Sequence, residues 1–441
     1  MLVHELGHLV AARAVGVEVE AFSIGWGPKV AGFTRGGTNW RVSALPIGGY
    51  CKMKGEDAFR RALEQKAAEI PKEPGSFYGA SPWRRIVIAL SGPLANVLFA
   101  FVVFTAVSAV GYTVPTSSNR VVLASEFNLD GKPSAASYPA DAAGLKSGDR
   151  IVSADGKPVA DYSDIQETIA LNAEKNLRLE VEREGGRLAL TVRPALDRET
   201  GAGRIGVYSW IEAVVDSVAE GSAAAIAGVE PGDRIVAVDG RRVDHAIALL
   251  AALGSKPERA TFLIERGGTS LETKLVLSWD DSGASNLGIG FASQRKTVKS
   301  AGIGPTISAG LAETWKTFAV SIKGLATLFK GVDLFKAVSG PARITYMVGK
   351  SASEGIQAKS PGGIALPFNF LAFLSIGLFI MNLLPIPALD GGLIAISAIE
   401  ALRRRPLKPL TVYRYQFVGS AMILAIFVFA TIGDVLFFAA K

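Results

Sequence analysis

Long apolar stretches alternate with polar ones along the chain. Three stretches contain no charged residue and are long enough to cross a membrane, which takes about 20 apolar residues in a helix. They run over 86–119, 360–389 and 415–433. We therefore predict membrane helices over 84–112 and 412–436, and a third membrane region over 364–394.

The first 17 residues form a further apolar segment. They read as a helix whose only polar side chains before Arg13 are His4, Glu5 and His8. Only three residues precede His4, too few for a spanning helix, so we expect the natural helix to begin upstream. We assign residues 1–20 to a first membrane helix, which gives about four membrane crossings in all.

The region 21–83 divides into two parts. The first is rich in glycine and aromatic residues, and Val30–Phe33 and Asn39–Leu45 flank a Gly-Gly pair. This pattern predicts a β-hairpin. The second part, 55–80, is charged and helix-forming, which indicates a loop that faces the solvent on the cytoplasmic side.

A ten-residue pattern occurs twice, at an offset of 84 residues. It reads Ala-Gly-Leu-Lys-Ser-Gly-Asp-Arg-Ile-Val over 143–152 and Ala-Gly-Val-Glu-Pro-Gly-Asp-Arg-Ile-Val over 227–236. An Asp-Gly turn, a helical segment and an alternating hairpin follow each copy. The two copies resemble tandem PDZ domains over 115–200 and 203–280, which take an extended peptide as an added strand. The alternative is a β-rich spacer without a ligand. His245 begins a helix here, where we expect it to be solvated.

Residues 305–331 show helical periodicity. One apolar stripe recurs in steps of three and four: Ile307, Leu311, Trp315, Phe318, Ile322, Leu325 and Phe329. Interspersed charges make the segment too polar to span a membrane. We predict an amphipathic helix that lies on the membrane surface or covers the core.

Composition agrees with a membrane protein. Apolar residues make up 49% of the chain, only 20% are charged, and mean hydropathy is +0.30. The net charge of +7 does not indicate nucleic-acid binding, because the basic residues cluster beside apolar runs. Arg84–Arg85 and Arg403–Arg405 place their loops in the cytoplasm by the positive-inside rule, so 115–280 should lie on the opposite face. One cysteine, Cys51, excludes an internal disulfide.

The sequence His4-Glu5-Leu6-Gly7-His8 carries the chemistry. Histidines four residues apart lie about 40° apart around a helix, so both imidazoles face one way. This geometry suits a zinc ion and leaves Glu5 beside it to take a proton from water. The alternative is that the motif arises by coincidence. The chain has only three histidines, and two of them fall in this one pattern, which disfavours that alternative.

A second unusual group is Asp390, at the end of the 360–389 run. Prolines at 385 and 387 and glycines at 391 and 392 loosen the helix there. An unpaired carboxylate at membrane depth is costly, so a partner is expected. Zinc held by His4 and His8 is the natural partner, and a helix-ending aspartate capped by water is the alternative.

The predicted membrane helix 84–112 also contains unusual residues. Gly92 and Asn96 are small or helix-perturbing groups that permit close helix contacts.

The order of these features resembles the site-2 protease family of intramembrane metalloproteases, in particular the bacterial branch that includes the regulator of sigma-E protease. The resemblance implies zinc ligands at His4, His8 and Asp390 and a water-activating base at Glu5. It further implies that Asn382, with Pro385 and Pro387 beside it, binds the unwound substrate. The glycine-rich segment around 22–49 would be the family's membrane-re-entrant β-loop. Leu393 stands where relatives often have histidine or arginine.

The expected fold is therefore a multi-pass α-helical membrane protein with a re-entrant β-hairpin and two inserted β-rich PDZ domains. The expected activity is that of a zinc-dependent metalloendopeptidase in regulated intramembrane proteolysis. Its partners would be membrane lipid and single-pass membrane proteins already trimmed by another protease, such as an anti-sigma factor or signal-peptide remnants. The PDZ domains would face the periplasm of a bacterial inner membrane and can take peptide C-termini.

Three other classes compete. An inactive PDZ membrane scaffold should have lost Glu5 or Asp390, and both are present. A transporter would show broken helices in related halves, whereas the only repeat lies between the membrane helices. The charge-free runs exclude a soluble zinc peptidase.

Overall fold

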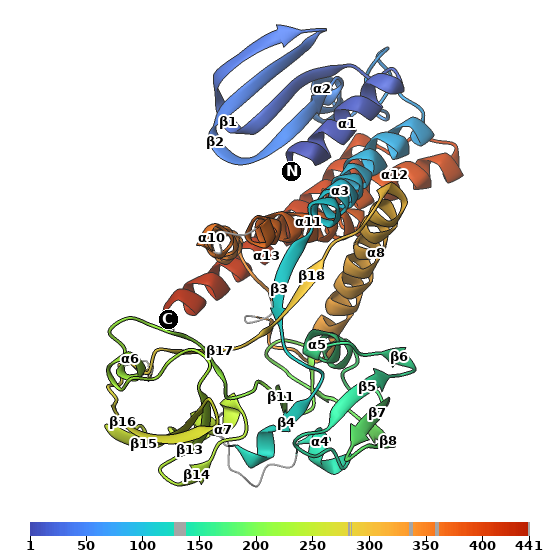
Figure 1. The fold of residues 1–441 in the computed structure, drawn as a ribbon. Coiled ribbons are helices and arrows are strands. Elements are labelled where there is room, and N and C mark those ends of the chain that lie inside the picture. The colour runs from blue at the N-terminus through green and yellow to red at the C-terminus, as the bar shows by residue number, and fades with distance from the viewer. Residues whose placement is uncertain (128–137, 281–282, 284, 335–337, 358–360, 440–441) are drawn as a thin grey trace. The chain divides into compact units, whose positions relative to one another are not determined.

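The computed structural model describes the chain except for residues 128–137, 281–282, 284, 335–337, 358–360 and 440–441 (Figure 1). Part of the predicted first PDZ domain and part of the segment after the second one, 281–304, thus lie outside the described residues. The chain forms two compact units. We call Met1–Tyr112, Val298–Ala326 and Leu334–Lys441 the helical unit, and Thr113–Thr297 with Thr327–Asp333 the strand-rich unit.

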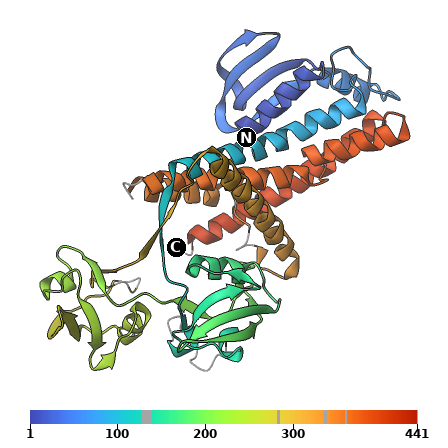
Figure 2. The same ribbon diagram turned by 45° about the vertical axis from the view of Figure 1, so that its right-hand side comes forward.

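Three helices of the helical unit are long and apolar enough to cross a membrane (Figures 1 and 2). They are α3 (Pro82–Val110), α11 (Pro361–Leu383) and α13 (Pro409–Ala439). We predicted about four spans; among the described residues, three helices are long and apolar enough to be spans. Helix α1 (Leu2–Ala14) has 13 residues, about 20 Å, which is shorter than the hydrocarbon core of a bilayer.

The predicted third membrane region, 364–394, is not one continuous helix. Helix α11 ends at Leu383, and α12 (Asp390–Arg403) begins only after a six-residue link. The two prolines of the link cannot donate backbone hydrogen bonds, and Ala388 has a φ of +74°. Another helix, α10 (Pro341–Gln357), was not predicted from the sequence.

Helix α3 is the centre of the helical unit and packs against α1, α11 and α12. Ala100, Val103 and Phe104 of α3 form an apolar core with three residues of α11, namely Ala372, Ile376 and Ile380. At its other end, α3 contributes Ile88 to a core with α1 and the first strand. Because both contacts use one rigid helix, α3 fixes where α1 lies relative to α11.

The predicted amphipathic helix exists as α8 (Ile303–Thr327), followed by η2 (Leu328–Lys330). Its buried residues are small or polar: Thr306, Gly310, Thr314 and Thr317. Close packing explains this face, since a Cβ at Gly310 would overlap Thr105 of α3. The apolar residues Ile307, Leu311 and Trp315 are 47–69% exposed instead. The predicted stripe therefore mostly faces away from the protein, as expected for contact with lipid.

The predicted hairpin is a more elaborate sheet. Strands β1 (Val19–Arg35) and β2 (Thr38–Met53) are long and antiparallel and turn at Gly36–Gly37. Residues 21–24 of β1 pair both with 39–42 and with 49–52 of β2. Both strands therefore bend back, and β1 near its start is flanked on two sides. The predicted helical loop after them contains one short helix, α2 (Glu56–Glu64).

The sequence repeat corresponds to two sheets with the same strand order. The first has the order β6-β5-β7-β8 and the second β14-β13-β15-β16. Their bounds are β5 (Arg150–Ala154), β6 (Lys157–Pro158), β7 (Leu177–Arg183), β8 (Gly186–Val192), β13 (Arg234–Val238), β14 (Arg241–Arg242), β15 (Arg259–Arg266) and β16 (Thr269–Val276). Helices α5 (Tyr162–Ala170) and α7 (Ala246–Ala252) occupy equivalent positions, and each repeat has its own apolar core.

Further strand pairs complete the repeats. Strand β4 (Val121–Leu123) pairs with β11 (Val207–Ser209), and β12 (Val215–Val218) pairs with β17 (Ile289–Phe291). The pairings extend past 200 and 280, the ends predicted from the sequence. The remaining short elements are β3 (Tyr112–Thr116), η1 (Ala124–Glu126), α4 (Pro139–Ala142), β9 (Ala195–Leu196), β10 (Gly203–Arg204), α6 (Ala223–Ile226) and β18 (Gln294–Val298).

One ion pair recurs in both repeats. The aspartate of the Gly-Asp-Arg motif binds an arginine at the end of the hairpin's first strand: Asp149 to Arg183, and Asp233 to Arg266. Both aspartates are buried. The prediction that His245 is solvated is wrong. Its side chain is 4% exposed and accepts a hydrogen bond from the backbone N–H of Ala248, which caps α7.

Candidate metal centre

The two histidines of the motif lie side by side on α1. Both are buried, and their Nε2 atoms are 3.2 Å apart. His8 Nδ1–H donates to the backbone carbonyl of Ile88 at 2.8 Å, which leaves its Nε2 free to act as a ligand. His4 Nδ1 lies 3.3 Å from the side-chain amide of Asn96. The amide atom nearest the ring is Nδ2; in the flipped orientation, with Oδ1 toward the ring, Asn96 accepts from His4 Nδ1–H and frees Nε2 in the same way.

Asp390, the first residue of α12, meets both imidazoles. One carboxylate oxygen lies 3.1 Å from His4 Nε2 and the other 3.4 Å from His8 Nε2. The oxygen that faces His4 is buried and has no hydrogen-bond partner of good geometry. An orphaned, buried carboxylate oxygen is unfavourable, which makes this oxygen a candidate ligand for a cation.

These separations fit zinc. Two ligands at about 2.05 Å from a tetrahedral ion lie about 3.3 Å apart. The two histidine Nε2 atoms are 3.2 Å apart; His4 Nε2 lies 3.1 Å from one Asp390 oxygen, and His8 Nε2 lies 3.4 Å from the other. Two imidazoles with one carboxylate are a donor set that zinc accepts in catalytic sites, and a fourth position stays open. His4, His8 and Asp390 can therefore hold zinc as three corners of a tetrahedron.

The chain after α11 explains how Asp390 reaches the histidines. The link folds tightly, and both glycines after Asp390 lie against its backbone. A Cβ at Gly391 would overlap the carbonyl of Leu383 or Leu384, and one at Gly392 that of Ile386. Only glycine permits these approaches, so the Asp-Gly-Gly sequence serves to place the carboxylate at the start of α12.

Helix α3 supports the site through one face. Ile88, Gly92 and Asn96 are four residues apart and therefore share that face. Ile88 and Asn96 orient the two histidines, and Asn96 is only 1% exposed. Gly92 lies directly against both rings. Sequence reasoning noted Gly92 and Asn96 as packing residues but missed these roles, although the four-residue spacing was a signal.

Glu5 lies next to the cluster on α1 but outside it. It is half-buried, and the three metal-binding candidates found among the described residues do not include it. A Cβ at Gly49 would lie 3.7 Å from Glu5 Cγ, so β2 passes directly beside this side chain. The carboxylate thus stands between the candidate metal site and a strand.

The predicted substrate-binding residues lie around the link. Asn382 is half-buried in the last turn of α11, and Pro385 and Pro387 belong to the link itself. They are therefore close to Asp390 in the sequence, at the break between α11 and α12. Their role in binding substrate stays a prediction.

A buried ion pair joins α12, which carries Asp390, to α3, which contacts the two histidines. Arg85 of α3 binds Glu400 of α12, and both side chains are less than a tenth exposed. Glu400 also accepts from the backbone N–H of Leu407 at 2.7 Å. Sequence reasoning used Arg85 only for topology and did not find its partner.

Known proteins resemble this chain over nearly its whole length. A family model described as "Peptidase family M50" matches residues 1–426. A Treponema pallidum (strain Nichols) protein named "Putative zinc metalloprotease" is 41% identical over 438 residues, which cover 99% of this chain and 96% of that protein. The Yersinia pestis "Protease RseP" is 30% identical, with 98% and 95% covered. The Caulobacter vibrioides "Metalloprotease MmpA" is 29% identical, with 98% and 91% covered.

The sequence motifs, the assembled site and the comparisons agree. The family match includes the His-Glu-x-x-His motif, the strand-rich unit and Asp390. The chain therefore belongs to peptidase family M50, the site-2 protease family that its motifs resemble.

Proposed function

We propose that this chain is a zinc-dependent endopeptidase that cleaves the transmembrane segments of single-pass membrane proteins. One observation carries the proposal. Two histidines and an aspartate from opposite ends of the sequence converge at zinc-ligand spacing beside Glu5. They do so in a unit with three helices long enough to span a membrane, which fits a substrate inside the bilayer.

The protein groups divide the chemistry among them. Bound zinc supplies a Lewis acid that polarises the scissile carbonyl and makes a nearby water acidic. Glu5 accepts a proton from the attacking water and passes it to the leaving amine, as a general base and then a general acid. Ile88 and Asn96 hold His8 and His4 in the required tautomer and orientation. Burial of the site limits the supply of competing water.

The substrate has to unwind before it can react. A transmembrane helix keeps its peptide bonds inside its own hydrogen-bond ladder. The β1–β2 sheet supports the next step, because β2 passes Glu5 and a strand can hold an extended segment by main-chain hydrogen bonds. Trp26, Val30 and Phe33 on this sheet are 55–70% exposed, as a surface in contact with lipid requires. Asn382, Pro385 and Pro387 then hold the unwound segment near Asp390.

The two repeats serve as tandem PDZ domains on the periplasmic side of a bacterial inner membrane. Their shared strand order, helix position and Asp–Arg pair support this assignment. They bind the new C-termini of trimmed substrates and exclude substrates that still carry a bulky outer domain. The substrates are therefore membrane proteins that another protease has already shortened, such as an anti-sigma factor or signal-peptide remnants.

The Glu5→Gln variant tests the proposal. Cleavage of a model transmembrane peptide should fall by about 10²–10⁴-fold, since general bases contribute this much, while zinc content stays near that of the wild type. Glu56→Gln, in the exposed first turn of α2, is the matched control and should keep full activity. Near-normal cleavage by Glu5→Gln would refute the assignment.

The metal assignment has its own variant. Asp390→Asn replaces an anionic ligand by a neutral amide and should lower the zinc content of the purified protein. Unchanged zinc content would place the third ligand elsewhere. If the wild-type chain bound zinc but cleaved no transmembrane peptide, the inactive PDZ scaffold would become the better interpretation.

A further inference from the structure

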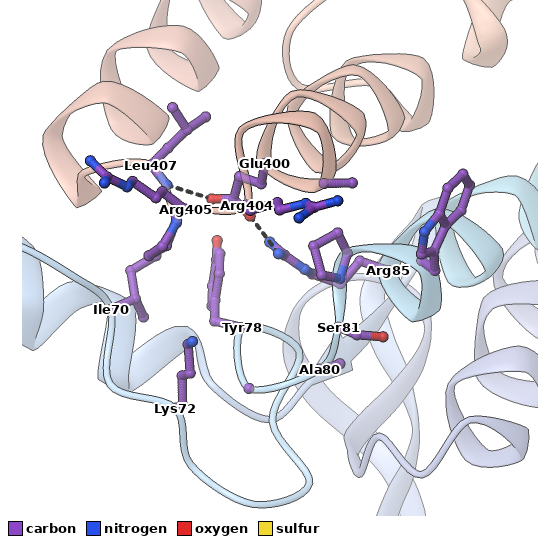
Figure 3. Close-up of a pocket in the computed structure, with 15 residues that line it drawn as sticks. Ile70, Lys72, Tyr78, Ala80, Ser81, Arg85, Glu400, Arg404, Arg405 and Leu407 are labelled. Carbon is purple, nitrogen blue, oxygen red and sulfur yellow. Dashed lines mark hydrogen bonds and ion pairs between the residues drawn. The ribbon is translucent and has the colours of Figure 1, made fainter.

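A cavity lies in the helical unit, and none of the metal-site residues lines it. It has a volume of about 480 Å³ and is open to the outside. Its walls come from the segment 70–85, which leads into α3, and from the end of α12 with the loop that follows (Figure 3). Nothing in the proposed cleavage reaction uses it.

Cations dominate the wall of this cavity. Lys72, Arg404 and Arg405 line it and are exposed. Among the described residues, their side chains make no ion pair or hydrogen bond with the protein. The one acidic residue in the wall, Glu400, is already bound to Arg85 and to the N–H of Leu407. The cavity therefore carries an uncompensated positive charge of three.

Further hydrogen-bond donors line the same cavity. Arg85 is buried at one side of the cavity, and its Nε–H has no hydrogen-bond partner. Burial raises the pKa of Tyr78 to about 12, so its hydroxyl stays protonated and can donate. Helix α3 begins at this wall, and its N-cap residue Ser81 makes no side-chain capping bond. The positive end of the helix dipole thus adds to the attraction for an anion.

The cavity lies at the level where membrane helices begin. Two helices of spanning length start there, α3 at Pro82 and α13 at Pro409. Trp83 lines the cavity and is 68% exposed, and tryptophan is enriched where a bilayer meets water. We therefore expect the cavity to lie at the depth of lipid headgroups, on the face where the positive-inside rule places basic residues beside anionic lipid.

We propose that this cavity binds a phosphate-bearing anion, held by Lys72, Arg404 and Arg405 against the start of α3. The depth of the cavity favours the headgroup of an anionic phospholipid over a free phosphate, and both present the same chemistry to the three cations. A bound headgroup would hold the end of α12, the helix that begins with Asp390.

Binding by the full-length protein in nanodiscs tests the proposal. The discs contain phosphatidylcholine alone or with increasing phosphatidylglycerol, and native mass spectrometry counts retained phosphatidylglycerol. A second arm adds inorganic phosphate to the phosphatidylcholine discs and follows thermal unfolding. Retained phosphatidylglycerol would support a lipid source for the anion. Stabilisation by inorganic phosphate alone would support a soluble source.

Two double variants separate the cavity from general surface charge. Lys72→Gln with Arg405→Gln should weaken phosphatidylglycerol binding about 100-fold, because each change removes a charge-assisted hydrogen bond to the phosphate that contributes about tenfold. Arg403→Gln with Lys408→Gln removes the same charge from exposed residues of the same region that do not line the cavity, and should retain binding to within about fivefold. Equal losses in both variants would overturn the proposal, as would failure of the wild type to bind either anion.

Discussion

Replacing Gly92 by alanine should damage the metal site while improving the helix. Gly92 lies inside α3 against the two histidine rings. A Cβ added there would overlap His8 and would lie 2.8 Å from His4 Cε1, whereas ordinary contacts are 3.4–4 Å. At least His4 would have to move by about 0.6 Å to restore a normal contact, and His8 would have to move further.

The magnitude follows from the tolerance of a metal site. Ligand positions for zinc hold to about 0.2 Å. The two histidine Nε2 atoms lie 3.2 Å apart, and each lies 3.1 or 3.4 Å from an oxygen of Asp390. A displacement of 0.6 Å or more exceeds that tolerance, so zinc affinity should fall about 100-fold, the upper end of effects from residues that orient ligands. The effect on helix stability has the opposite sign, because alanine is more favourable than glycine inside a helix by about 1 kcal/mol.

Zinc content and peptide cleavage distinguish the two effects. The purified variant is dialysed against a weak chelator, and its zinc is measured by mass spectrometry alongside cleavage of a transmembrane peptide. Gly377→Ala is the matched control, because Gly377 lies inside α11 with no atom within 4 Å of an added Cβ. It should keep zinc and activity. If Gly92→Ala also keeps its zinc and its activity, the packing of α3 against the histidines does not determine their positions as ligands.

Three further outcomes are expected. Glu400→Ala leaves the guanidinium of Arg85 buried and unpaired and should lower the free energy of unfolding by about 3–5 kcal/mol, measured by denaturant titration in detergent; a loss below about 1 kcal/mol would contradict this. Asp434→Ala removes the carboxylate that accepts three backbone N–H bonds at the start of α10, so hydrogen exchange in that first turn should become at least tenfold faster, and unchanged protection would count against this role. Hydrogen bonds from Arg266 lower the pKa of Asp233 below its ordinary value, so their stabilisation is present above about pH 4 and lost as pH falls through the lowered pKa. Thermal unfolding of the strand-rich unit should therefore show a weaker acid dependence in Arg266→Gln, and an equal dependence in both proteins would disprove the linkage.

The sequence alone determined the features that depend on local periodicity or spacing. Charge-free runs are visible because a bilayer demands about 20 apolar residues in succession, and α3, α11 and α13 follow from them. The His4–His8 spacing fixes that both rings share a face of α1. The repeat predicted two units of equal topology, because the same turn residues and alternation recur in order.

Only the tertiary structure decided which distant groups meet. That Asp390 meets both histidines depends on the tight link after α11, whose prolines and glycines are visible in the sequence, and on the packing of α12 against α3, which has no local signal. The roles of Asn96 and Gly92 arise because α1 crosses α3 at that face. His245 is buried, contrary to prediction, because its ring caps α7 inside a repeat. Side-chain burial and helix contacts are set by the whole fold, so a pattern along the chain names the candidate residues and the fold assembles them into a site.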